Sequence, residues 1–541
     1  MTRRWPAALL FLGLAAFAGF PLALLLVRAA RAPDVAWWDT WAAPGAAQAL
    51  EGTLVTSAGA ALFAFAVGVP LAVLLVRTDV GLERPLKAVF TLPTAIPPFI
   101  LGMGWVSLAN PKAGLLNLAL GAGTLDIYGA TGIAFVLGSG GLPLVLLGTG
   151  AALSRIDSSL EEAARMSGAS AARALFTVTL PLALPAALSG AALTFLYAAS
   201  AFGVPYLLGV TATPPTPTLT TRIYGEVLMG ASGLERAAVL SVELLVLAAL
   251  VLLASRWLTR AGEVRLSSGK GLSIRRMPLG RWRGPLTALA VALAIVLVVL
   301  PLLAVALTSV QPVWGQWSGL TTKHWGAVLS NPRTLSAAGR SVVLALSSAA
   351  LVTAFGLAIA STKRRWLEAL SGAPYAVPGT VLALALLVAF SREVRFVAFD
   401  RVAFVLAIGN TLWMLLVAYT VKYLAFGSRN ASDALAQVDP SLAEASRIFG
   451  ASPARAFVDA TLPQLRGALG AAFLVTFLVC MTELTLSVLL IPTGSDVLGT
   501  LLFELQSYAD PGAAAVIACA FVLVLLAAQA LQALVVGKEA R

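Results

Sequence analysis

The stretch DSSLEEAARMSGASAARALFTVTLP runs from Asp157 to Pro181, and the stretch DPSLAEASRIFGASPARAFVDATLP runs from Asp439 to Pro463. The two align at an offset of 282 without a gap, and 15 of their 25 positions are identical. Self-similarity over such a distance is typical of a chain that contains two copies of one structural unit. The segment therefore predicts a duplicated fold, with one copy of this loop in each half.

The composition places these loops in a membrane protein. Of 541 residues, 59% are hydrophobic and 11% are charged, and the mean hydropathy is +0.90. A soluble domain carries roughly a quarter charged residues, whereas a bilayer solvates the apolar surplus. The sequence predicts an all-α integral membrane fold with about twelve spans. The predicted spans are 6–27, 50–76, 88–109, 130–152, 183–209, 236–257, 286–308, 338–360, 369–390, 401–424, 467–490 and 512–536.

Proline pairs in the third and ninth spans repeat at nearly the same offset. Pro93 and Pro97 correspond to Pro374 and Pro378 at an offset of 281. Spans one to six therefore match spans seven to twelve in the same orientation, which is a parallel repeat about an axis along the membrane normal. The prolines can bend their helices, because each lacks an amide hydrogen. The predicted division is 1–258 for the first half, 259–285 for a basic linker and 286–541 for the second half.

The basic residues predict the orientation. With the N-terminus in the cytoplasm, cytoplasmic segments hold 26 of the 37 Lys and Arg residues, so both termini are expected there. Eight of these lie between Arg256 and Arg283, in a flexible linker rich in Gly and Ser. The net charge of +12 therefore reflects topology, and no nucleic-acid partner is expected. The first apolar run is longer than a signal-peptide core, so we interpret it as an uncleaved span.

Each copy of the repeated segment has the local chemistry of a short helix-turn-helix. Asp157 and Asp439 suit the N-cap position, since a short acceptor satisfies amides of the first turn. Gly168 and Gly450 suit the left-handed turn that ends such a helix. Further expectations are a capping box between Ser158 and Glu161, Pro440 and Pro453 at first helical positions, Ser170 and Ser452 as caps of a second helix, and helix ends near Met166 and near Pro181 or Pro463.

Two gapless copies favour a surface that binds a duplicated partner over a solvated connector. The chain has no phosphate-binding G-x-x-x-x-G-K-[ST] string, so any ATP is expected on another subunit. His324 is the only histidine, and Cys480 and Cys519 both lie in apolar runs. We therefore expect no metal site, no cofactor and no enzymatic site in this chain.

At these residues the sequence resembles the EAA-loop family, the permeases of binding-protein-dependent ABC importers. The resemblance implies a type I ABC importer permease fold, in which the EAA loop docks into a groove of the ATPase subunit. It also implies an ATPase partner in two copies, a periplasmic or lipid-anchored substrate-binding protein, and a place in the cell inner membrane. The implied docking residues are Glu162, Ala163, Ala164 and Gly168 in the first loop, and Glu444, Ala445, Ser446 and Gly450 in the second.

Within that family, the two-in-one arrangement looks most similar to ferric-iron-type permeases. The supporting stretches are PTAIPPFILGMGW (93–105), SAFGVPYLLG (200–209) and TLTTRIYGEV (218–227). The resemblance implies ferric iron as the solute, while permeases for thiamine or 2-aminoethylphosphonate look similar. A different class, an ion-coupled secondary transporter with twelve spans, shares the repeat but has no role for twin EAA loops. A channel has none either.

Two acidic residues are candidates for the translocation path. Iron-type permeases often carry an acid where this chain has Ala201, and the repeat offset pairs Ala201 with Glu483. An ionisable group at membrane depth usually faces a cavity or a partner, which makes Glu483 the stronger candidate and Glu243 the weaker one. A packing hydrogen bond is the alternative role for each.

Overall fold

In the computed structural model the chain divides into two compact units, each described here by itself. The first-half unit comprises residues 33–324, and the second-half unit comprises residues 325–541 together with residues 1–32. The described residues are 5–32, 34–42, 45–263, 276–316, 318–398 and 401–539. The centre of the predicted linker, 264–275, lies outside them.

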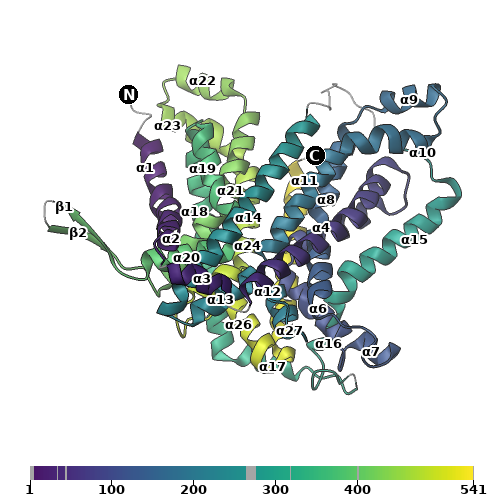
Figure 1. Ribbon diagram of the computed structural model, residues 1–541. Coiled ribbons are helices and arrows are strands. Elements are labelled where there is room, and N and C mark those ends of the chain that lie inside the picture. The colour runs from purple at the N-terminus through teal and green to yellow at the C-terminus, as the bar shows by residue number, and fades with distance from the viewer. Residues whose placement is uncertain are drawn as a thin grey trace. The chain divides into compact units, whose positions relative to one another are not determined.

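The first-half unit is a bundle of long helices with short helices at their ends (Figure 1). Its long helices form because their apolar runs bury side chains against one another and satisfy every backbone amide internally. They are α4 (Ala46–Arg77), α8 (Ala130–Arg155), α11 (Leu180–Ser200), α14 (Ala231–Glu263) and the bent pair α5 (Glu83–Thr91) with α6 (Pro98–Ala109). The helices α15 (Arg283–Ala294) and α16 (Leu300–Thr308) are joined by a π-helical turn. The short helices are α3 (Asp34–Ala42), α7 (Leu115–Leu120), α9 (Ser158–Met166), α10 (Ala171–Ala174), α12 (Gly203–Pro205) and α13 (Leu219–Leu228).

The second-half unit repeats this plan. Its long helices are α1 (Trp5–Leu14) with α2 (Phe20–Ala30), α18 (Pro332–Ser361), the bent pair α19 (Arg365–Ala376) with α20 (Gly379–Phe390), α21 (Leu412–Gln437), α24 (Leu462–Met481) and α27 (Pro511–Glu539). Its short helices are α22 (Pro440–Ile448), α23 (Pro453–Ala456), α25 (Thr485–Leu490) and α26 (Leu498–Glu504), and α17 (Lys323–Ser330) crosses the boundary between the units.

The span prediction agrees with the structure except at the tenth span. Among the described residues, nine helices are long and apolar enough to cross a membrane, or eleven if each bent pair is one span. The tenth predicted span is α21, which begins at Leu412 and not at 401. Residues 401–406 instead form strand β2 (Arg401–Leu406), which pairs antiparallel with β1 (Val394–Ala398). The β-branched and aromatic residues here suit a strand as well as a helix, and an apolar run alone does not separate the two.

The proline pairs break both spans that contain them. The helix axis turns by 103° between residues 94 and 98, and by 101° between residues 376 and 379. Pro98 begins α6, and Pro378 immediately precedes α20, so each break starts a new helix where a proline costs least. The predicted bends are therefore confirmed at both positions.

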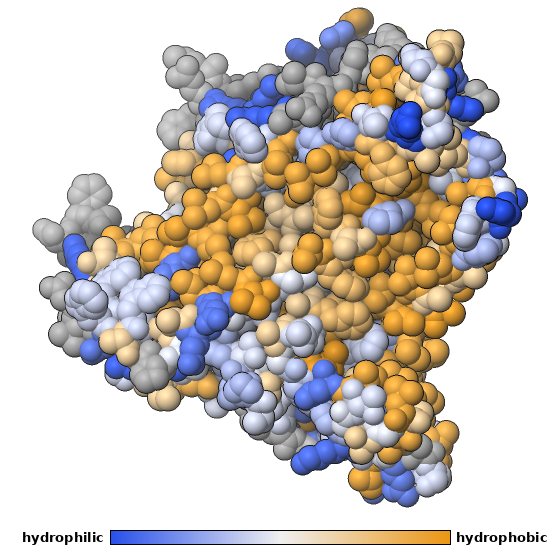
Figure 2. Space-filling view, turned by 45° about the vertical axis from the view of Figure 1, so that its right-hand side comes forward, coloured by the Kyte–Doolittle hydropathy of each residue, from blue (hydrophilic) through white to orange (hydrophobic). Residues whose placement is uncertain are grey.

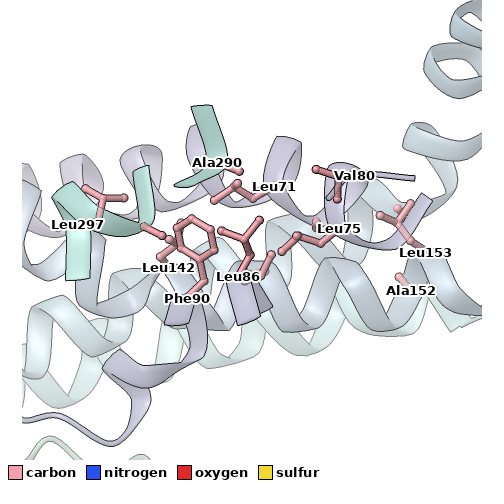
Figure 3. Close-up of a cluster of buried hydrophobic side chains, with 14 of the residues drawn as sticks. Leu71, Leu75, Val80, Leu86, Phe90, Leu142, Ala152, Leu153, Ala290 and Leu297 are labelled. Carbon is pink, nitrogen blue, oxygen red and sulfur yellow. The ribbon is translucent and has the colours of Figure 1, made fainter. Parts of the chain in front are cut away.

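The span that opens the second sequence half packs inside the first-half unit. Ala290 and Leu297 lie in one buried cluster with Leu75 of α4, Phe90 of α5 and Leu142 of α8 (Figure 3). Further along, α16 approaches α6 so closely that a Cβ atom on Gly104 would lie 2.2 Å from the Pro301 carbonyl oxygen. Glycine at this position is what permits the contact.

The first span of the chain packs in the same way within the second-half unit. Ala7 and Leu14 share a buried cluster with Ile359, Leu367 and Leu424, and α2 packs on α20. Each compact unit thus contains the opening span of the other sequence half. The compact units reflect packing in space and not the sequence repeat. The repeat boundaries at 258 and 286 therefore stay a prediction from the sequence.

A matching hydrogen bond shows that the two units repeat in three dimensions. The amide of Leu219 donates to Thr53 Oγ1 (2.8 Å), which fixes the start of α13 on α4. The amide of Leu498 donates to Ser341 Oγ (2.8 Å), which fixes the start of α26 on α18. The surface agrees with a membrane location, since hydrophobic residues cover a broad area of the face in Figure 2 and hydrophilic residues gather at its margins.

Candidate functional site

The first repeated loop folds as its caps predict. The Asp157 carboxylate accepts a hydrogen bond from the Ser159 amide (2.9 Å), and α9 ends at Met166. Gly168 follows with a φ of 91°, in the left-handed region that ends helices. Ser170 Oγ then accepts from the Arg173 amide (3.2 Å) and caps α10.

The second loop has the same backbone course. The Asp439 carboxylate accepts from the Ser441 amide (2.9 Å), and this hydrogen bond lowers the pKa of Asp439. Gly450 has a φ of 88°. The carbonyl oxygen of Ser446 accepts from the Ala451 amide (3.1 Å), as that of the matching Ala164 accepts from Ala169 (3.0 Å). The Ala-to-Ser difference between the loops therefore leaves the turn unchanged.

Two details of the predicted loop are wrong. Glu161 does not close a capping box with Ser158, because its carboxylate accepts from Arg77 and Thr179 instead. The second helix also does not end near Pro181 or Pro463, since helix continues over 171–200 and 453–481. A π-helical turn that ends two residues before each proline (Leu175–Thr179 and Phe457–Thr461) changes the hydrogen-bond pattern, so the helix passes the proline without a break.

Both loops expose apolar side chains beside the residues implied by the EAA motif. Met166 is 85% exposed, and Ile448 at the matching position is 83% exposed. Phe449 next to it is 91% exposed. The exposed or half-exposed residues around them include every motif residue: Glu162, Ala163, Ala164, Gly168, Glu444, Ala445, Ser446 and Gly450. Large apolar side chains at a water-facing helix end are typical of a surface that another protein covers.

Glu483 lies in a polar cluster at a break in the helix of its span. The Tyr423 hydroxyl donates to its carboxylate, and the Leu486 amide donates to Oε1 (3.0 Å), which caps α25. Lys422 Nζ donates to the carbonyl oxygens of Val377 and, at 3.3 Å, Tyr375. These carbonyls belong to the bend before α20, where the proline leaves backbone acceptors without partners. The structure thus brings Glu483 together with a bent span.

Glu243 is placed differently. It lies within α14 of the first-half unit, half-buried, and its Oε1 is buried without a hydrogen-bond partner among the described residues. Ala201, the counterpart of Glu483, marks the equivalent break between α11 and α12, and its carbonyl accepts from Thr220 Oγ1 (2.7 Å). At the break in the first half a backbone carbonyl accepts from a hydroxyl of α13, whereas in the second half the Glu483 carboxylate accepts from Tyr423 and Leu486.

Sequence reasoning missed two of the groups that matter here, Arg77 and Lys422, and it gave Glu161 the wrong partner. The local sequence of Arg77 and Lys422 carries no signal, because each finds its partner across at least 45 residues. Charged residues are rare within or beside apolar runs, and this was the one sequence signal that could have identified them.

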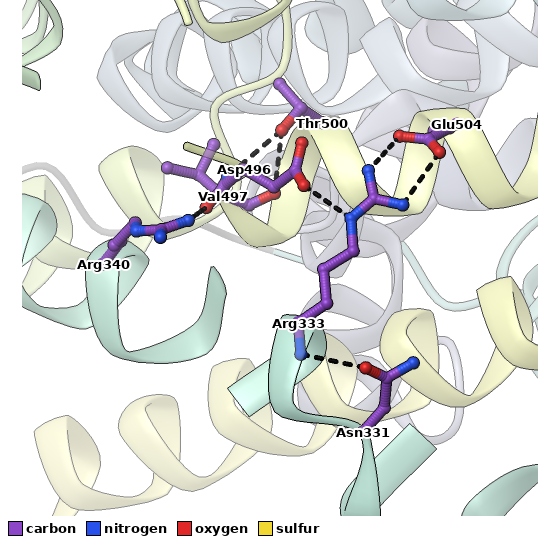
Figure 4. Close-up of polar contacts among 7 residues, drawn as sticks. All are labelled: Asn331, Arg333, Arg340, Asp496, Val497, Thr500 and Glu504. Atoms are coloured by element: carbon purple, nitrogen blue, oxygen red, sulfur yellow. Dashed lines mark hydrogen bonds and ion pairs between the residues drawn. The ribbon is translucent and has the colours of Figure 1, made fainter. Parts of the chain in front are cut away.

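Ion-pair clusters hold the ends of the units opposite the repeated loops. In the second-half unit, Arg333 at the start of α18 donates to the Asp496 carboxylate (2.7 Å) and to both carboxylate oxygens of Glu504 (Figure 4). Arg340 donates to the backbone carbonyl of Asp496. The first-half unit has a different cluster, in which the buried Glu226 pairs with Arg222 (2.9 Å) and faces Arg236 (3.9 Å) beside a pocket of about 280 Å³. These ends have diverged more than the loops.

The family is decided by comparison with known proteins. Residues 64–311 and 341–540 each match the family described as "Binding-protein-dependent transport system inner membrane component". The chain belongs to this family. It is therefore a multi-pass membrane permease of the ABC importer class, as the twin loops indicated. The first match ends just past α16, the exchanged span that packs in the first-half unit.

Individual relatives differ in how much of the chain they cover. The Fe(3+)-transport system permease protein FbpB 2 of Haemophilus influenzae is 25% identical over 490 residues, 89% of this chain and 88% of its own length. The molybdenum transport system permease protein ModB of Escherichia coli is 30% identical over 226 residues, 40% of this chain and 95% of its own length. This permease thus matches one relative along nearly its whole length and another over 40% of its length.

The two acids should respond oppositely to an apolar substitution. Glu483→Leu leaves the Tyr423 hydroxyl and the Leu486 amide without their acceptor, and each unpaired buried donor costs about 1–3 kcal/mol. Glu243→Leu removes an oxygen that has no hydrogen-bond partner among the described residues. We expect thermal unfolding of the purified protein in detergent to shift down for Glu483→Leu and to stay level or rise for Glu243→Leu. Equal losses for both variants would contradict this assignment.

Proposed function

We propose that the loops 157–181 and 439–463 are the docking surfaces for two copies of an ATPase subunit, and that ATP hydrolysis there drives solute import. One observation carries the proposal: two loops with the same caps, turn and exposed apolar face stand at matched positions in the two units. A duplicated rigid surface fits a duplicated partner. The chain contains no phosphate-binding P-loop sequence, which agrees with ATP hydrolysis on separate subunits.

The proposed orientation puts both loops in the cytoplasm. Lys and Arg are concentrated in the segments on that side, and translocation leaves such segments inside. Both termini are then cytoplasmic, the membrane is the cell inner membrane, and the opposite ends of the units receive solute from a binding protein outside. The Arg333 and Glu226 clusters lie at those receiving ends.

Alternating access is the proposed mechanism. Closure of the ATPase pair would move the loops, and each loop continues without a break into a long helix of its unit. Those helices end at Ser200 and Met481, next to the breaks at Ala201 and Glu483. A displacement at the loop therefore reaches membrane depth along a single helix. Glu483 and its neighbours Lys422, Tyr375 and Tyr423 form the polar part of the proposed path.

Ferric iron is the proposed solute. The support is the relative FbpB 2, an Fe(3+)-transport permease that aligns with 89% of this chain. A second candidate is an oxyanion. It is favoured by the molybdenum and sulfate transport permeases among the relatives and by the Lys422 amino group, a hydrogen-bond donor at the bend before α20.

Replacing the loop glycines should weaken ATPase docking. Gly168→Val or Gly450→Val puts a β-branched residue at positive φ, which costs about 1–2 kcal/mol and should reduce binding roughly fivefold to thirtyfold per loop. The measurement is co-purification of the ATPase subunit with the membrane-inserted chain. Gly123→Val is the matched control, because Gly123 has a φ of 76° and open space around it but precedes α8 at the opposite end. Docking that survives both loop variants, or falls equally in the control, would refute the docking role.

Uptake by the complete transporter tests the solute. Cells that express the chain with its own ATPase and binding protein should accumulate radiolabelled ferric iron, and Glu483→Gln should reduce the rate. Radiolabelled molybdate and sulfate, offered separately, are the comparison. Accumulation of an oxyanion without iron would exclude ferric iron and favour the second candidate.

A further inference from the structure

An ion pair between a buried arginine and a half-buried glutamate ties the first loop to the end of a membrane span. Arg77 is the last residue of α4 and is only 2% exposed. Its Nη2 donates to the carboxylate of Glu161 in α9, and the same carboxylate accepts from Thr179 Oγ1 at the start of the fifth span. One acid therefore joins three elements of the first-half unit: α4, α9 and the helix that leads into α11.

The guanidinium group depends on this one acid. Its Nε and Nη1 are buried without hydrogen-bond partners among the described residues, so Glu161 supplies the compensating charge. A buried charge is tolerated only with a partner, and removing that partner is far more disruptive than breaking an exposed pair. The contact between α9 and α4 is thus a fixed connection and not an exchangeable surface pair.

The chain that enters the second sequence half is attached at the same place. The Met277 amide donates to the Arg77 carbonyl (2.8 Å), and the Leu279 amide donates to the Asp79 carboxylate (2.8 Å). Arg276 forms an ion pair with Glu83 (2.7 Å).

A further bond follows where α15 begins, since the Gly81 amide donates to Thr287 Oγ1 (3.0 Å). Segment 276–279 therefore runs along residues 77–83 and delivers α15 against α5. Whatever moves Arg77 also moves the start of the exchanged span.

In the part of the chain that the structure describes, the second loop shows no matching ion pair to the end of a span. Ala443 stands at the position of Glu161, and α18 ends in the exposed Ser361 where α4 ends in Arg77. Among the described residues, the second loop forms an ion pair between Arg455 and Asp459 (3.3 Å), which are one helical turn apart and both exposed. That pair joins the loop to itself and not to a span.

We propose that Arg77 and Glu161 are positioning residues that make the two loops mechanically unequal. The first loop moves together with α4 and α15, while the second loop moves relative to α18. This inference rests on the proposed docking of an ATPase on both loops, and it adds that force entering the first loop is passed directly to two further spans.

The test is the number of solute molecules transported per ATP hydrolysed by the assembled transporter in proteoliposomes. Glu161→Gln should leave ATPase co-purification intact, because the exposed face of α9 is unchanged. It should lower the transport-to-hydrolysis ratio between about twofold and thirtyfold, the range of measured coupling changes. Arg365→Gln, which removes an exposed charge at the start of α19 outside both loops, is the control and should leave the ratio unchanged.

A second variant and a second readout guard against misfolding. Arg77→Leu combined with Glu161→Leu removes both charges, so no unpaired charge stays buried, and the same fall in the ratio is expected. In the free wild-type chain, backbone amides of α22 should exchange with deuterium faster than those of α9, and Glu161→Gln should raise the α9 rate toward that of α22. An unchanged ratio with normal docking would overturn the inference alone. Failure of the wild-type chain to bind the ATPase would overturn the proposed function itself.

Discussion

The exchanged opening spans are the contact on which the rest of the structure depends. In lipid there is little hydrophobic drive between helices, so association relies on close packing and small residues. Gly104 provides such a contact for α16, and the cluster around Phe90 and Leu142 receives α15. Because the opening span of each sequence half is built into the unit of the other, neither half forms its compact unit from its own sequence alone.

That arrangement gives the linker a mechanical role beyond joining two halves. Its last residues, 276–279, are bonded along the end of α4 and lead straight into α15. The bonds lie beside the Arg77–Glu161 pair, so the loop, span two and span seven meet at one point. In the other unit Ala443 stands at the position of Glu161, and α18 ends in the uncharged Ser361. The two loops of the permease therefore have similar exposed surfaces but differ in the contacts that join each loop to its unit.

Local features were predictable, and long-range ones were not. The N-cap role of Asp157, the left-handed turn at Gly168 and the bends at the proline pairs follow from interactions within about four residues, which sequence displays directly. The paired strands β1 and β2 were missed because their residues also suit an apolar helix. The spacing of Glu161 predicted a capping box, but its carboxylate instead pairs with Arg77, which is 84 residues away. The buried guanidinium of Arg77 is a stronger partner for the Glu161 carboxylate than a backbone amide of α9. The local sequence around Glu161 does not show that this arginine lies close by in the fold.

The number of ATPase subunits bound by one chain tests the central claim most directly. Native mass spectrometry of the assembled complex, released from detergent or nanodiscs, measures it without reference to the solute. Two equivalent loops predict one permease chain with two ATPase subunits, and a single subunit when either Gly168 or Gly450 is replaced by valine. One subunit on the wild-type chain, or two that persist when both loops are altered, would contradict the account.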